Sequence, residues 1–307
     1  MLVACHGKLI ANRYRLQGRA ATGGAGEVWR ASDLTLGRPV ALRLLRCEST
    51  AEARGFLAAA ERAARLRHPG VVQVYDYGQF AAEGIGYLVT EPAGVTSLAT
   101  VLGTGPLEPA WVLSMIRAVA SALDAAHTLG LVHQHINPRN LLLAPGGVVK
   151  LTDFGSPQAA EPPASAPGYL APERMPGIPG TPASDLYSLG AVAWECLTGK
   201  QLPTDLDRGG PQLPRLPAPV GAGVSALVAD LTAIDPAARP GSAARVAELA
   251  GELLAVPMRA SEGNGPAGGL LDPESHGSGS LRDRPGARQG ADRAAVRGDD
   301  LYQVRAG

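Results

Sequence analysis

The chain has few cysteines and no net charge, and each of these two features argues against a class of protein. Its 3 cysteines, Cys5, Cys47 and Cys196, lie in no metal-ligand spacing, which argues against disulfides and zinc and indicates a reducing compartment. A formal net charge of +0 argues against a general nucleic-acid or membrane-surface binder. No apolar run approaches the roughly 18 residues that span a bilayer, and the first residues lack the apolar core of a secretory signal. We therefore expect a cytoplasmic protein without a membrane span.

The composition divides the chain into a folded part and a tail. An apolar fraction of 45% in 307 residues is enough for a globular core. Residues 256–307 turn to Gly, Pro, Ser and balanced charge with few large apolar residues, so a disordered tail is predicted there. Within it, LYQV at 301–304 is either a docking stub or an end without function. The folded domain is predicted over residues 11–255, after an N-terminal extension at 1–10.

The folded part is organised around residues 131–143, LVHQHINPRNLLL, and residues 150–155, KLTDFG. Two short apolar strands flank a polar turn, and the second strand delivers Asp153, Phe154 and Gly155. This layout resembles the catalytic and metal-binding core of the eukaryotic-like serine/threonine protein kinases of bacteria, whose loops read H-R-D-x-K-P-x-N and D-F-G.

The resemblance implies an α+β, two-lobed protein-kinase-like fold. It places a small antiparallel β N-lobe with one main helix at 11–90, a hinge at 91–98 and a larger, mostly helical C-lobe at 99–255. The strand-rich start of the sequence and its helix-rich remainder agree with that division.

The catalytic loop departs from the family pattern where chemistry is concentrated. His135 stands where the family keeps its catalytic Asp, and Asn137 stands where it keeps the loop Lys. Asn140 and Asp153, at the positions of the family's magnesium ligands, are both present. Ala166 replaces the Thr that bonds the catalytic Asp and Lys in the family, so all three members of one hydrogen-bonding unit differ together.

A glycine-rich turn, TGGAG, lies between predicted strands at 12–20 and 27–33. Rossmann and P-loop sites need a helix after their glycines, so a strand here excludes both. The kinase pattern G-x-G-x-x-G-x-V instead matches at Gly23, Gly26 and Val28, with Ala at the first glycine, which predicts a weakened phosphate cradle. A lone glycine-rich turn is more often only a hairpin turn, so this assignment depends on the neighbouring motifs.

The cation and the carboxylate that pair in the family's N-lobe are both replaced. In the predicted strand 38–46, Arg43 takes the place of the phosphate-contacting Lys, which is not a conservative change at such a site. Since lysine occurs only at positions 8, 150 and 200, compositional drift from Lys to Arg is the alternative. In the predicted helix 51–67, Ala59 occupies the position of the family's Glu, and Glu61 is turned away by about 200°. We expect no carboxylate of this helix within salt-bridge reach of Arg43.

The resemblance also places an adenine site at the hinge. Thr90 is the gatekeeper, and the carbonyl of Glu91 and the amide of Ala93 are the groups that would bind adenine. Pro92 removes a donor that this geometry does not use. Three apolar residues would form the walls of the slot: Val28, Ala41 and Leu142. The alternative of equal weight is that these are ordinary core positions without a ligand.

The residues that stabilise the family's C-lobe are retained. Glu173 and Arg239 are expected to form a buried ion pair, and Asp185 is expected to hold the catalytic-loop backbone. Apolar residues at helical spacing predict helices at 109–129, 184–199 and 242–255.

Two functions follow from this combination. The first is a pseudokinase, a nucleotide-binding or scaffold module in signalling that binds a protein partner and transfers little or no phosphate. The second is an active or weakly active serine/threonine kinase with a protein substrate, with Arg43 contacting phosphate and His135 as an improvised base. Weak binding of ATP with Mg²⁺ is expected, since Asn140 and Asp153 still offer oxygen ligands. The coordinated replacements favour the pseudokinase.

Overall fold

The computed structural model describes residues 4–23, 26–47, 49–92, 96–154, 167–174, 178–203, 216 and 220–255. All of them lie within the unit Met1–Met258. Ala93, Gly155, Ala166 and the tail 256–307 lie outside the described residues, so the expectations for them stay predictions.

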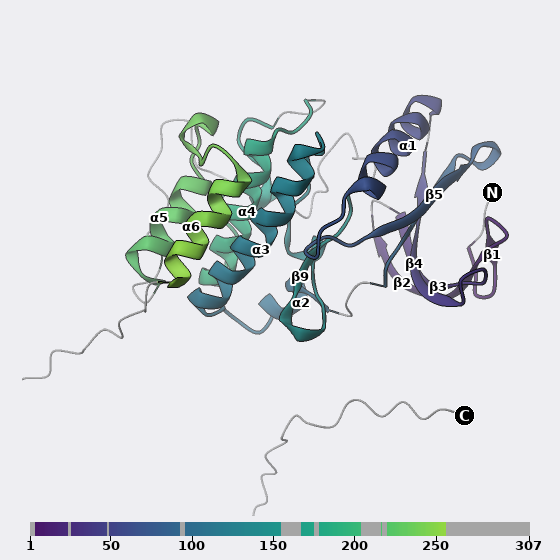
Figure 1. Ribbon diagram of the computed structural model, residues 1–307, viewed down its shortest axis with the longest axis horizontal. Coiled ribbons are helices and arrows are strands. Elements are labelled where there is room, and N and C mark those ends of the chain that lie inside the picture. Colours follow the sequence, from purple (N-terminus) through teal and green to yellow (C-terminus); the bar gives the residue numbers. More distant parts are fainter. Residues whose placement is uncertain are drawn as a thin grey trace, which may run out of the picture. The chain divides into compact units, whose positions relative to one another are not determined.

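The N-terminal part is a six-stranded antiparallel sheet with the strand order β1-β2-β3-β4-β6-β5 (Figure 1). The strands are β1 (Leu9–Ile10), β2 (Tyr14–Gly23), β3 (Gly26–Asp33), β4 (Arg38–Arg46), β5 (Val74–Phe80) and β6 (Ile85–Thr90). A short 3₁₀ turn, Ala81–Glu83, separates β5 from β6. The expected small antiparallel lobe is confirmed. The pairing of Leu9 with Arg15 carries the sheet into the segment that we assigned to an N-terminal extension.

One helix, α1 (Thr50–Arg65), packs against β5 and β6. Ser49 caps its N-terminus by accepting a hydrogen bond from Glu52 N at 3.1 Å. Phe56, Ala60 and Ala63 lie on its buried face, at the spacing of an amphipathic helix. The lobe therefore has the single main helix that the sequence predicts.

The C-terminal part contains α2 (Leu98–Leu102), α3 (Pro109–Thr128), α4 (Pro182–Thr198), α5 (Ala222–Leu231) and α6 (Ala243–Ala255). A small antiparallel sheet of β7 (Thr96–Ser97), β8 (Leu141–Leu143) and β9 (Val149–Leu151) carries the predicted loops. The chain turns in 3₁₀ geometry at Pro138–Asn140, Pro145–Gly147, Pro167–Tyr169 and Pro236–Ala238. Among the described helices, none is both long and apolar enough to cross a bilayer.

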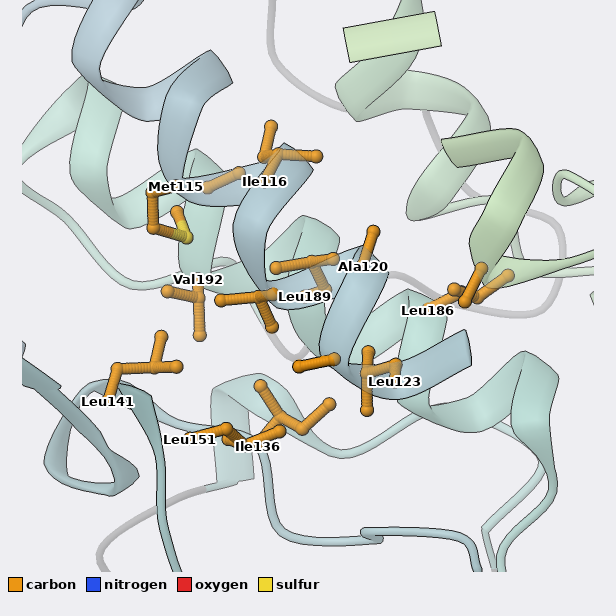
Figure 2. Close-up of a cluster of buried hydrophobic side chains, with 14 of the residues drawn as sticks. Met115, Ile116, Ala120, Leu123, Ile136, Leu141, Leu151, Leu186, Leu189 and Val192 are labelled. Carbon is orange, nitrogen blue, oxygen red and sulfur yellow. The ribbon is translucent and has the colours of Figure 1, made fainter. Parts of the chain in front are cut away.

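The core of this part lies between α3, α4 and the small sheet (Figure 2). Met115, Ile116 and Leu123 of α3 are almost completely buried, as are Leu189 and Val192 of α4. Figure 2 also shows Ile136, Leu141 and Leu151, which extend this cluster to the catalytic loop and to β8 and β9. The loop that carries the candidate site is therefore anchored in the main core.

The predicted helix at 184–199 begins two residues earlier, at Pro182. Thr181 and Ser184 form a reciprocal capping box, with Ser184 N bonded to Thr181 Oγ1 at 3.2 Å and Thr181 N to Ser184 Oγ at 3.0 Å. The helix ends at Thr198 and is followed by Gly199, whose φ of 69° is left-handed. The capping box is what the sequence interpretation overlooked.

Candidate active site

Asp185, in the first turn of α4, fixes the backbone of the catalytic loop. Its Oδ2 accepts a hydrogen bond from His133 N at 2.8 Å, and its Oδ1 accepts one from Gln134 N at 2.7 Å. His127 Nε2 lies 2.9 Å from Oδ2. The carboxylate is fully buried, and these three groups with the helix N-terminus give the compensation that a buried charge requires. The expected role of Asp185 is confirmed.

His133 joins the catalytic loop to the segment that carries Asp153. Its Nε2 donates to Thr152 O at 2.7 Å, and its Nδ1 accepts from His135 N at 3.2 Å, which defines a neutral tautomer protonated on Nε2. The buried ring meets Phe154 edge to face, with the centroids 4.7 Å apart. No role for His133 was predicted from the sequence, although it is the first residue of the matched H-R-D pattern.

His135 is a neutral side chain at the position where the family has a permanent negative charge. Burial, with smaller contributions from His133 and Arg174, lowers its pKa to about 4. The buried Nε2 has no hydrogen-bond partner among the described residues. An imidazole with such a low pKa is a weak base, and it cannot reproduce the electrostatic effect of an Asp carboxylate.

Asn137 and Asn140 bind the backbone of the loop itself. Asn137 Oδ1 accepts from Arg139 N at 2.9 Å, and its Nδ2 donates to His135 O at 2.9 Å. This local pairing is typical of Asn in turns and differs from the long reach of a Lys. Asn140 Nδ2 also donates to His135 O at 2.9 Å, while Asn140 O accepts from Thr152 N at 3.0 Å. The amide oxygen of Asn140 is therefore the side-chain atom that could bind a metal.

Asp153 is bound by Arg43, the residue at the family's Lys position. Arg43 Nη2 lies 2.8 Å from Asp153 Oδ2, and the two side chains are only 18% and 17% exposed. Thr152 Oγ1 lies 3.3 Å from the other carboxylate oxygen. Asp153 has a left-handed backbone with a φ of 78°, an uncommon conformation that costs free energy and frequently marks functional sites. The sequence indicated both residues but not that they pair with each other.

This arrangement fits a magnesium ion poorly. Mg²⁺ needs oxygen ligands in near-octahedral geometry, and one oxygen of Asp153 already lies 2.8 Å from a guanidinium nitrogen. In the part of the chain that the structure describes, no group of three or more His, Cys, Asp or Glu residues could hold a metal. A metal bound by Asn140 and Asp153, the family's ligand pair, would have to share Asp153 with Arg43.

Glu61 of α1 lies on the exposed side of the helix, as the helical register predicts. Glu61 is exposed and binds Arg65 one turn later, at 2.6 Å. Ala59 is half-buried on the same helix. The expectation that no carboxylate of α1 reaches Arg43 stays a prediction.

Glu91 connects the hinge to the strand before Asp153. Its Oε1 lies 2.6 Å from Lys150 Nζ and accepts from Gln73 N at 3.0 Å. Its backbone carbonyl accepts from the Thr90 hydroxyl at 3.1 Å, and a carbonyl has a second lone pair for another donor such as adenine. The role of Lys150 was missed, although lysine is so rare in this chain that its position could have drawn attention.

Of the residues predicted to enclose adenine, Val28 and Ala41 lie on the neighbouring strands β3 and β4, and Leu142 lies on β8 of the small sheet. Val28 pairs with Arg43 across β3 and β4, and Ala41 pairs with Thr90 across β4 and β6. Val28, Ala41 and Leu142 are each half-buried, whereas Leu42 is fully buried. The adenine slot therefore stays a prediction.

Gly23 of β2 pairs with Gly26 of β3, on either side of residues 24 and 25, which lie outside the described residues. Gly26 has a φ of 111°, and a Cβ there would lie 2.0 Å from Leu44 O. Close approach of two strands therefore requires a glycine at this position whether or not phosphate binds.

Glu173 and Arg239 form the expected buried ion pair. Two guanidinium nitrogens lie 2.6 and 2.8 Å from the two carboxylate oxygens, and Arg239 Nη1 also donates to Ala183 O at 2.9 Å. Burial raises the pKa of Glu173, but the bond to Arg239 and further favourable interactions outweigh it, so the pKa is lowered overall. This pair, predicted from the sequence, is confirmed.

A two-lobed arrangement with the catalytic-loop and magnesium-loop positions side by side defines a protein-kinase fold. Residues 14–210 match the family model of the protein kinase domain, which is more than half of the chain. The chain belongs to the protein kinase family. The crystal structure of a double mutant of the Mycobacterium tuberculosis PknI kinase domain superposes with a TM-score of 0.70 at 27% identity, covering 82% of this chain and 100% of that one.

Curated relatives are bacterial serine/threonine-protein kinases. PknA of Mycobacterium tuberculosis strain H37Rv is 41% identical over 210 residues, which cover 64% of this chain and 49% of PknA. PrkC of Bacillus subtilis strain 168 is 34% identical over 206 residues, which cover 63% of this chain and 32% of PrkC. The chain thus spans about half or less of the length of these relatives.

Proposed function

We propose that this protein is a pseudokinase, a cytoplasmic nucleotide-binding or scaffold module that acts in signalling through a protein partner and transfers little or no phosphate. The observation that carries the proposal is the 2.8 Å ion pair between Arg43 and Asp153. In the kinase mechanism the Asp of this loop holds magnesium, while the strand Lys and the helix Glu pair with each other.

The other replacements act in the same direction. His135 supplies no negative charge, and both polar groups of the Asn137 side chain bind the local backbone. Phosphoryl transfer depends mainly on positioning and charge stabilisation, and misplacement by about 1 Å already costs roughly a hundredfold in rate. Residues that hold the fold, such as Glu173 and Arg239, are meanwhile retained.

The second candidate is a weakly active serine/threonine kinase that uses ATP and Mg²⁺ on a protein substrate. The observation in its favour is the 41% identity to PknA, which is named as such a kinase. A lost base need not abolish phosphoryl transfer, because the enzyme does little covalent chemistry in that reaction.

A radiolabel transfer assay separates the two candidates. Purified protein is incubated with labelled ATP and Mg²⁺ or Mn²⁺, alone and with a generic protein substrate, beside Asp153→Asn. We expect the wild-type signal to equal that of Asp153→Asn. Robust labelling that Asp153→Asn abolishes would support the active kinase and reject the pseudokinase.

A further inference from the structure

Arg43 places a fixed cation where the family places magnesium. Its Nη2 lies 2.8 Å from Asp153 Oδ2, and neither side chain is more than 18% exposed. A divalent cation beside the guanidinium would be repelled, and the carboxylate oxygen that lies 2.8 Å from Nη2 is less available to a metal. Arg43 and a metal ion therefore compete for Asp153.

We infer that Arg43 takes the part of the divalent cation, so that the site binds the polyphosphate of a nucleoside triphosphate in its metal-free form and Mg²⁺ competes with this binding. The inference rests on the proposed function, because it assumes a site for nucleotide without a need for catalysis. A guanidinium carries five N–H donors in a planar fork, so one side chain can hold a carboxylate and a phosphate oxygen together. A Lys ammonium at this position would lack that forked geometry.

The charge of the surrounding residues agrees with this role. Of the three acidic positions that the family concentrates here, two hold Ala59 and His135, neither of which carries a carboxylate. The third, Asp153, is balanced by Arg43. A site with so little negative charge attracts a divalent cation weakly and repels a bare polyphosphate weakly.

The loop geometry agrees as well. Asn140 is held by its side-chain nitrogen on His135 O and by its carbonyl on Thr152 N, so its amide oxygen alone adds a side-chain ligand beside Asp153. One amide oxygen with a carboxylate already bound to Arg43 is a poor set for an ion that dehydrates reluctantly.

Equilibrium binding of a fluorescent ATP analogue to the full chain tests the inference, in EDTA and in excess Mg²⁺. Wild type is expected to bind the analogue more tightly in EDTA than in excess Mg²⁺, because Mg²⁺ competes with this binding. In EDTA, the affinity of Arg43→Gln for the analogue is expected to be about tenfold or more lower than that of wild type, the value of a lost hydrogen bond between charged groups. In Mg²⁺ this variant should regain affinity, because Asp153 is no longer paired with Arg43. Arg46→Gln is the matched control, since it removes the same charge from an exposed position of the same strand.

A second measurement does not depend on the folding of the Arg43 variant. Electron paramagnetic resonance of added Mn²⁺ should give the same bound fraction in wild type and Asp153→Asn, with and without the ATP analogue. Mn²⁺ bound by wild type and lost in Asp153→Asn would overturn the inference.

The outcomes separate this inference from the proposed function. Binding of the analogue only with Mg²⁺, or no binding in either condition, would overturn the metal-free site. Neither result would be evidence that the protein transfers phosphate. Robust phosphate transfer rejects the pseudokinase instead, and is read in the separate radiolabel assay.

Discussion

At the scale of single residues, those that fix the catalytic-loop backbone match the family, whereas the residue at the position of its catalytic Asp differs. Asp185 and His133 keep their partners in the catalytic loop, whereas His135 has a buried nitrogen without one among the described residues. Buried polar groups are normally paired. In this loop the backbone amides of His133 and Gln134 have partners, whereas the side-chain nitrogen of His135 has none among the described residues. Under the proposed function, this loop keeps its backbone geometry while the residues at the catalytic positions differ from those of the family.

Asp33 offers a residue-scale test of stability against pH. It is buried at the end of β3, and its carboxylate binds Arg13 at 2.8 and 2.7 Å and the amides of Thr35 and Leu36. The bond to Arg13, with the amide bonds, lowers its pKa from 3.8 to about 2.

Because the folded pKa lies below the unfolded one, the stabilisation by Asp33 is fully present above about pH 4 and is lost as the pH falls through about 2. The free energies of unfolding in urea of wild type and Asp33→Asn should therefore differ by a constant amount near neutral pH. This difference should shrink between about pH 4 and pH 2. Asp230→Asn, at an exposed position of α5, is the control. A difference that stays constant down to pH 2 would contradict the assignment.

At the scale of elements, ion pairs connect segments far apart in the sequence. Glu91 of the hinge binds Lys150 of β9, and Glu173 binds Arg239 beside the start of α4. Residues in loops lack the hydrogen bonds of a helix or sheet, and each ion pair fixes such a segment to a distant part of the chain. These pairs keep the hinge and the C-lobe loops in place without any need for catalysis.

Glu173→Ala tests this element-scale role. Arg239 is buried, so removal of its partner leaves an uncompensated charge, and a loss of about 3 kcal/mol in unfolding free energy is expected. Denaturant unfolding measures it. Glu248→Ala, which removes an exposed partner of Arg245, should change stability by less than about 1 kcal/mol. Equal effects of the two substitutions would contradict a structural role for the Glu173 pair.

Sequence patterns predicted elements and motif positions well because both depend on local spacing. The strand 38–46 and the pair of Glu173 with Arg239 follow from alternation and from motif order. The pair of Arg43 with Asp153 could not be predicted in this way, since the cation lost its usual carboxylate and side chains 110 positions apart choose partners only in three dimensions. Lys150 with Glu91 was missed for the same reason.

At the scale of the whole molecule, the described residues have the fold of the protein kinase family, and we propose that the reacting groups were exchanged together. The retained core around α3 and α4 supports the catalytic loop as it would in an active enzyme. Residues that act as a unit are strongly non-additive, so the loss of one makes the others free to change. The protein is therefore best understood as a kinase scaffold whose Arg43 and Asp153 now pair with each other.

Restoration of the exchanged residues tests this account most directly. Phosphate transfer from labelled ATP with Mg²⁺ is measured for wild type, for His135→Asp, and for one variant that combines Arg43→Lys, Ala59→Glu, His135→Asp and Asn137→Lys. The account predicts very slow or no transfer by wild type and little recovery by His135→Asp. The combined variant should transfer phosphate at least about tenfold faster than His135→Asp, because the unit is restored together. Wild-type transfer as fast as that of the combined variant would contradict it.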